Sequence, residues 1–173
     1  MTRLDQRLQG HRLLTLYIDG ASKGNPGTAG AGIWMADEKG KKIFQKSQYL
    51  GYRTNNEAEY EALLLGLKEA QRLAQRLGPI SIRIYTDSEL VEKQINGLYQ
   101  VKNLNLKALH ASALQYLGGF SSYTIESIAR EMNQEADRLA NEAIQRAAKE
   151  KKRGREEPMV APHSCEGRKV RAP

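Results

Sequence analysis

The sequence predicts an α/β domain in which helices flank a mixed five-stranded sheet, in the order βββαβααβα. Two observations carry this prediction. The first 50 residues contain segments in which apolar side chains alternate with period two, as in strands. From residue 54 onward, apolar stripes at helical spacing alternate with short segments rich in β-branched residues. That alternation is typical of a layered α/β domain.

The first predicted strand covers residues 13–19, where Leu14, Leu16 and Ile18 alternate with more polar side chains. The next segment, GASKGNPGTAG, is rich in glycine and proline and is predicted to be a loop. AGIWMA and KIFQKSQYL predict two further strands, joined by the polar turn DEKGKK. Together the three strands are expected to form an antiparallel meander.

The clearest helix begins after Thr54, which with Glu57 matches a capping box. Gly78-Pro79 predicts its end. Its apolar stripe is formed by Leu63, Leu67, Ala70, Ala74 and Leu77.

The second half of the chain predicts a strand at 81–87, helices at 88–96 and 104–117, a fifth strand in SYTIESIA and a helix at 133–148. We therefore predict a domain at 13–148, a flexible N-terminal segment at 1–12 and a disordered basic tail at 149–173.

Composition indicates a globular protein, with 40% hydrophobic and 27% charged residues. The net charge is +7; residues 148–173 carry eight Lys or Arg against four acids, and the remainder nineteen against sixteen. A basic tail favours polyanion partners, although charge alone does not specify one. The single cysteine, the polar N-terminus and the absence of a long apolar run predict a cytoplasmic protein that does not associate with membranes. We also expect a monomer, although no sequence feature specifies the oligomeric state.

Two carboxylates come at or near predicted strand ends. Asp19 follows an apolar strand and precedes Gly20, and Asp87 stands directly before a helix. In α/β sheets the carboxyl ends of strands face the usual ligand crevice. For each residue alone, a simple turn or helix-capping role is the stronger alternative.

Glu59 is singled out by helical phase. It precedes Leu63 by four positions and Leu67 by eight, so it continues the apolar stripe, whereas Glu57 and Glu61 lie on other faces. An inward carboxylate is costly unless a cation or a hydrogen-bond donor meets it. Asp137 lies in the first turns of the last helix, where a favourable interaction with the helix dipole explains it equally well.

If these four acids converge, their mutual repulsion raises their proton affinities unless a divalent cation neutralises them. Oxygen-only ligands favour Mg²⁺ or Mn²⁺, and two such ions are suited to in-line phosphoryl displacement. Spacing alone leaves the convergence open.

Four blocks, IDGASKGNPG, TNNEAEYEALL, YTDSELV and REMNQEADRLAN, resemble in that order the conserved blocks of type 1 ribonuclease H. The resemblance covers residues 13–147. It implies the ribonuclease H-like fold, two divalent metal ions, and cleavage of the RNA strand of an RNA–DNA hybrid to leave 5′-phosphate and 3′-hydroxyl ends. It assigns Asp19, Glu59, Asp87 and Asp137 as catalytic, metal-binding carboxylates.

The resemblance also implies substrate contacts. Thr54 and Asn103 match positions that hold a phosphate of the DNA strand, and Asn25, Asn55 and Asn56 match positions near the minor groove. Local roles are the alternatives, because Thr54 caps a helix and Asn25 precedes a proline.

The sequence departs from the bacterial pattern in two places. The loop before Asp137 lacks a histidine and carries Arg130, as in archaeal-like members, and we expect Arg130 to approach the scissile phosphate; a surface salt bridge with Glu131 or Glu135 is the alternative. The segment 94–110 carries no basic protrusion, so hybrid binding is expected to be weaker or to use the tail, and activity on double-stranded RNA is left open.

Two other functions compete with this prediction. A hybrid-binding module without catalysis is disfavoured because all four acids are present. A resolvase or integrase-like nuclease of the same fold is disfavoured because such enzymes share the acids but not the full TNNEAEYEALL and TDSELV blocks.

Overall fold

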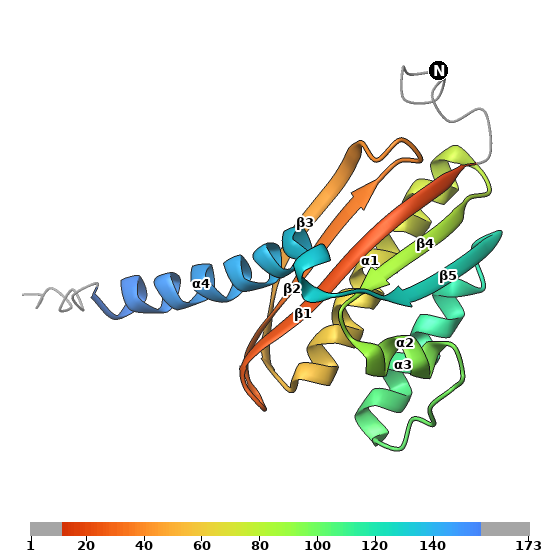
Figure 1. Ribbon diagram of the computed structural model, residues 1–173. Helices are drawn as coiled ribbons and strands as arrows, with labels where there is room; N and C mark the ends of the chain where they lie inside the picture. The colour runs from red at the N-terminus through yellow and green to blue at the C-terminus, as the bar shows by residue number, and fades with distance from the viewer. Residues whose placement is uncertain (1–11, 157–173) are drawn as a thin grey trace, which may run out of the picture.

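A five-stranded mixed sheet forms the centre of the computed structural model, which describes residues 12–156 (Figure 1). The strand order is β3-β2-β1-β4-β5. β1 pairs antiparallel with β2 and β2 antiparallel with β3, while β1, β4 and β5 run parallel. The predicted meander and fold class are confirmed. The strands are β1 (Leu13–Gly24), β2 (Gly27–Ala36), β3 (Lys42–Arg53), β4 (Ser81–Thr86) and β5 (Ser122–Ser127).

Helices cover both faces of the sheet. α1 packs against β1 from one side, and α4 packs against β2 from the other. None of the helices in the described part of the chain is long and apolar enough to cross a membrane. The helices are α1 (Asn55–Leu77), α2 (Glu89–Ile95), α3 (Leu104–Leu117) and α4 (Gln134–Glu156), with a short 3₁₀ turn, η2 (Arg130–Met132), before α4.

The core lies mainly between α1 and the sheet. The capping box predicted at the start of α1 is present, because Thr54 Oγ1 accepts from the Glu57 backbone and the Glu57 carboxylate accepts from the Thr54 backbone. Leu63 and Leu67 are fully buried against β-strand residues such as Leu16. The apolar stripe read from the sequence therefore sets the face that α1 buries.

The predicted glycine-rich loop is in fact a β-hairpin. β1 continues to Gly24 and β2 begins at Gly27, with a cis Asn25–Pro26 bond between them. The loop prediction was wrong because small residues here serve close packing. A Cβ added at Gly30, the last residue of the predicted loop, would overlap the Ala140 carbonyl oxygen of α4, so only glycine lets that helix approach β2 this closely.

The last helix is longer than predicted. α4 was expected to end at residue 148, but it continues to Glu156, so residues 149–156 are helical and do not begin a disordered tail. Ala147 is the last buried side chain, and Lys149 to Arg153 are exposed. The rest of the predicted tail, 157–173, and the predicted flexible segment up to residue 11 lie outside the described residues.

Candidate active site

Three of the four predicted carboxylates meet at the centre of the sheet. Asp19 lies within β1, Asp87 follows β4, and Glu59 lies in the second turn of α1. One carboxylate oxygen from each lies within 4.8 Å of the others. β1 and β4 are parallel neighbours, which brings Asp19 and Asp87 together despite 68 positions of sequence separation. The convergence that spacing alone left open is present in the fold.

Glycine allows Glu59 to reach this cluster. The Gly20 backbone N–H donates to Glu59 Oε2 over 3.1 Å. A Cβ at Gly20 would overlap the Ala58 carbonyl and the Glu59 backbone nitrogen, so α1 approaches β1 here only because the side chain is absent. The inward direction of Glu59, inferred from helical phase, is what the structure shows.

The cluster is electrostatically strained without a cation. Burial, and then the charges of Asp87 and Asp137, raise the pKa of Asp19 from 3.8 to about 7. Burial, and then the charges of Asp19 and Asp87, raise the pKa of Glu59 well above its ordinary value. Only 4% of Asp19 is exposed, so water screens this repulsion poorly.

The donor set fits a divalent cation. Asp19 Oδ2 and Asp87 Oδ1 are buried and accept no hydrogen bond from any described residue. A buried carboxylate oxygen without a partner is costly, and a metal ion satisfies it. All the available ligands in the cluster are carboxylate oxygens, which hard divalent ions prefer.

Asp137 is placed differently from the other three acids. Its charge reaches Asp19, but its own carboxylate pairs with Arg130, whose Nε donates to Oδ1 over 3.1 Å and whose Nη2 donates to the same oxygen. The salt bridge considered for Arg130 with Glu131 or Glu135 is not the one found; Glu135 pairs with Arg138 instead. Arg130 is therefore tied to the acidic cluster.

The cluster forms one wall of a polar cavity of about 390 Å³. The lining residues that were not singled out from the sequence include Lys23 and Asn141. Both lie inside the quoted blocks, yet their spacing carries no chemical signal because lysine and asparagine are common on exposed strands and helices. The lining is formed by Asp19, Gly20, Ala21, Ser22, Lys23, Asn55, Glu59, Asp87, Arg130 and Asn141.

Thr54 and Asn103, the two predicted phosphate contacts, are joined by a hydrogen-bond network. Each caps a helix, α1 and α3 respectively. Glu57 links them, because its carboxylate accepts from Thr54 on one side and from Asn105 Nδ2 over 2.9 Å on the other. Asn105 in turn donates its backbone N–H to Asn103 Oδ1. The capping roles and a shared outward-facing polar surface coexist here.

The three predicted minor-groove asparagines lie close to this surface. Asn25 Oδ1 accepts from the Asn55 backbone N–H over 3.1 Å, which holds the β1–β2 hairpin against the start of α1. Asn55 lines the cavity, and Asn56 is exposed. The hairpin and the start of α1 thus present one continuous polar edge beside the acids.

Comparison with known proteins places this site in a family. Residues 17–143 match a family described as reverse transcriptase-like. Ribonuclease HI of Halobacterium salinarum is 38% identical over 128 residues, which are 74% of this chain and 62% of that protein. Among solved structures, LC11-RNase H1 in complex with an RNA/DNA hybrid superimposes with a TM-score of 0.75 at 38% identity, covering 78% of this chain and 99% of that one. The chain belongs to the type 1 ribonuclease H family.

The ribonuclease H region is only part of some relatives. The bifunctional protein Rv2228c of Mycobacterium tuberculosis is 38% identical over 137 residues, 78% of this chain but 36% of that protein. The chain thus spans less than two thirds of both the Halobacterium and the Mycobacterium proteins. Within this type 1 ribonuclease H the acidic cluster of Asp19, Glu59 and Asp87 is the candidate metal site.

Proposed function

We propose that this chain is a metal-dependent endoribonuclease that hydrolyses the RNA strand of RNA–DNA hybrids and leaves 5′-phosphate and 3′-hydroxyl ends. The observation that carries the proposal is the group of three carboxylates with two unpartnered buried oxygens in a polar cavity. The hybrid bound by LC11-RNase H1 supports the choice of substrate.

The residues around the cavity have different roles in this proposal. Asp19, Glu59 and Asp87 would hold the metal, with Asp137 as a fourth ligand once Arg130 releases it, and we propose two Mg²⁺ or Mn²⁺ ions. When bound, such ions supply Lewis acidity that activates water and stabilises the leaving oxygen. The Gly20 N–H fixes the Glu59 carboxylate, and Arg130 places a positive charge at the mouth of the cavity, where a phosphate enters. In this proposal Arg130 stands where bacterial members carry a histidine.

Recognition of the hybrid is assigned to the polar edge described above. Thr54 and Asn103 would meet a phosphate of the DNA strand. Asn25, Asn55 and Asn56 would meet the minor groove, where amides can hydrogen-bond base edges and 2′-hydroxyls. The 2′-hydroxyl then distinguishes the RNA strand from DNA.

Substitution of the metal ligands tests the proposal. Asp87→Asn and Asp19→Asn should each abolish Mg²⁺-dependent cleavage of a defined hybrid while the circular dichroism spectrum stays unchanged. Glu38→Gln removes one exposed carboxylate in the β2–β3 turn and should cleave at the wild-type rate. Near-full activity of either aspartate variant would show that the site is misassigned.

The same assay separates the competing functions. Hybrid, double-stranded RNA and branched DNA are offered in parallel, with Mg²⁺ or Mn²⁺. Cleavage of the hybrid supports the proposal, and cleavage of double-stranded RNA as well would extend it. Binding without turnover would indicate a non-catalytic module, and cleavage confined to branched DNA would indicate a resolvase.

A further inference from the structure

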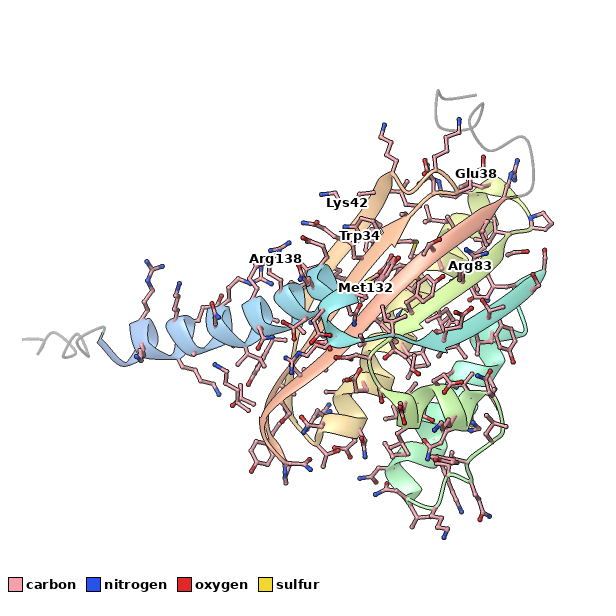
Figure 2. All side chains as sticks on the ribbon, in the orientation of Figure 1. Trp34, Glu38, Lys42, Arg83, Met132 and Arg138 are labelled. Carbon is pink, nitrogen blue, oxygen red and sulfur yellow. The ribbon has the colours of Figure 1, made fainter. Side chains whose placement is uncertain are left out.

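The end of α4 beyond Ala147 is exposed wherever the structure describes its side chains. Residues 148–153 are all exposed, yet the helix continues to Glu156. Figure 1 shows this end projecting beyond the sheet, and Figure 2 shows its side chains extending outward along it. Helices in proteins are stabilised mainly by packing of one face, so these exposed side chains contribute little to the core and are available to a partner.

The charge of α4 reverses along its length. Between Gln134 and Gln145 the helix carries three acids and one base, Arg138. Between Arg146 and Arg153 it carries five bases and only one acid, Glu150. Basic residues in the last turn suit the helix dipole, but that effect fades within one turn, and the basic run begins more than two turns before Glu156.

One side of α4 leads from the polar cavity that holds the acidic cluster, called the cleft below, to the basic residues. Asp137 and Asn141 lie on the side of α4 that faces the cavity, and Asn141 lines it. At 3.6 residues per turn, Gln145, Ala148 and Lys152 continue that side, with Lys149 adjacent. With a rise of 1.5 Å per residue, Lys152 lies roughly 22 Å from Asp137 along the helix.

We propose that the basic end of α4, formed by Lys149, Lys152 and Arg153, binds the phosphate backbone of the nucleic-acid duplex that occupies the cleft. The contact would lie about 20 Å from the cleaved phosphate, roughly six base pairs away at about 3.4 Å per base pair. The inference rests on the proposed function, because the duplex in the cleft is the occupant that would carry phosphates to this helix.

A nucleic acid fits this surface better than other anionic partners. Lys23 and Arg130 already place positive charge along the cavity, so the basic end of α4 extends an existing path. The exposed side of the basic end lacks the large apolar side chains with which a membrane-bound helix inserts into lipid. Lys151 also lies over the Tyr49 ring, 5.9 Å from its centroid, which steadies the helix against β3.

The test compares two triple variants of the full chain, each losing three positive charges. Lys149→Gln/Lys152→Gln/Arg153→Gln changes the basic end of α4. The matched control, Lys39→Gln/Lys41→Gln/Lys42→Gln, changes exposed lysines around the β2–β3 turn, at the opposite end of the sheet from the cleft; Figure 2 marks Lys42 there. Both are made with Asp87→Asn, so that binding is measured without cleavage.

Binding is measured on hybrids of about 8 and about 20 base pairs over a range of salt concentration. On the long hybrid, the α4 variant should bind about 10-fold or more weakly at low salt, with a log–log salt slope smaller by about 2 to 3. A short hybrid centred on the acidic cluster extends only about four base pairs to each side and does not reach α4, so its affinity should change less than about 2-fold. The control variant should match the parent on both lengths.

Three results would overturn the inference. The first is an unchanged affinity and salt slope of the α4 variant on the long hybrid. The second is an equal loss of affinity on the long and the short hybrid. The third is a loss of binding to vesicles of anionic lipid while hybrid binding stays intact, which would assign the helix to a membrane. If wild-type protein cleaves the hybrid in any of these cases, the proposed function stands and only this inference falls. If wild-type protein neither binds nor cleaves it, both fall.

Discussion

The Arg130 guanidinium donates twice to a single oxygen of Asp137, through Nε over 3.1 Å and through Nη2. The pair stands beside the three clustered acids, and the charge of Arg130 lowers the pKa that Asp19 would otherwise have. Asp137 is thus neutralised by an exposed side chain, which a metal ion could replace at the carboxylate and a phosphate could draw away from it.

Arg130→Gln should slow hybrid cleavage by about 10-fold or more, because the cavity loses a positive charge that faces the substrate. The Arg130 side chain is 68% exposed, so the free energy of unfolding should change by less than about 1 kcal/mol. Arg130→Lys should restore part of the rate. Single-turnover cleavage and urea denaturation measure the two effects. A wild-type rate for Arg130→Gln would show that the ion pair is a surface contact with no role in cleavage.

The metal-free protein should lose stability as the pH rises. The pKa of Asp19 is raised from 3.8 in the unfolded chain to about 7 in the fold, so the folded state holds the proton more tightly. This contribution is fully present below about pH 4 and is lost as the pH rises through about 7. In the presence of a chelator, Asp19→Asn should therefore increase the free energy of unfolding by about 1 to 3 kcal/mol at about pH 8, and by less at about pH 5.

Urea denaturation at these two pH values measures this effect, with Glu38→Gln as the exposed control. Mg²⁺ added at the higher pH should stabilise wild-type protein and not Asp19→Asn. Parallel pH dependences for wild type and Asp19→Asn would contradict the assignment of the repulsion to this residue.

Gly20→Ala should be among the most damaging single substitutions in the chain. The added methyl group overlaps the Ala58 carbonyl, so α1 must move away from β1 and take Glu59 with it. We expect a loss of about 3 kcal/mol or more in unfolding free energy, together with loss of cleavage. Gly118→Ala is the matched control, because its Cβ would meet only ordinary contacts at 3.6 Å, and it should be nearly neutral in thermal denaturation.

Asn133 ties the Arg130 segment to the sheet. It is 1% exposed, and its Nδ2 donates to the Ile18 carbonyl over 2.8 Å, directly before Asp19. Asn133→Ala should cost about 1 to 3 kcal/mol, because the Ile18 carbonyl loses its donor. Amide hydrogen exchange should report faster opening of residues 128–133, and unchanged exchange there would show that other contacts hold the segment.

Much of the fold was accessible from side-chain periodicity. Glu59 was identified as inward-facing from its phase relative to Leu63 and Leu67, and it contacts the Gly20 backbone as that phase requires. The parallel pairing that joins Asp19 to Asp87 was not accessible in the same way. It depends on β1 and β4 becoming neighbours, and no local pattern encodes that.

The features that the sequence did not predict correctly also depend on the packed structure. Gly30 was included in a predicted loop, but it faces α4, and only the packed structure reveals the contact. Residues 149–156 lack an apolar stripe and so indicated disorder, although lysine, glutamate and arginine are good helix formers that can extend an existing helix. The Asp137–Arg130 pair joins residues seven apart across a 3₁₀ turn, a geometry with no sequence signature.

The strand order has a consequence for how the protein folds. Asp19 and Asp87 meet only after the parallel pairing of Leu13–Tyr17 with Ser81–Tyr85, which closes a long segment containing β2, β3 and α1. Contacts between residues this distant in sequence form late and slowly. Asp19 and Asp87 therefore repel one another only once β1 and β4 are paired, and affinity for a divalent ion would emerge at that same step. Metal binding during refolding would thus report this parallel pairing and would be insensitive to formation of the β1–β2–β3 meander alone.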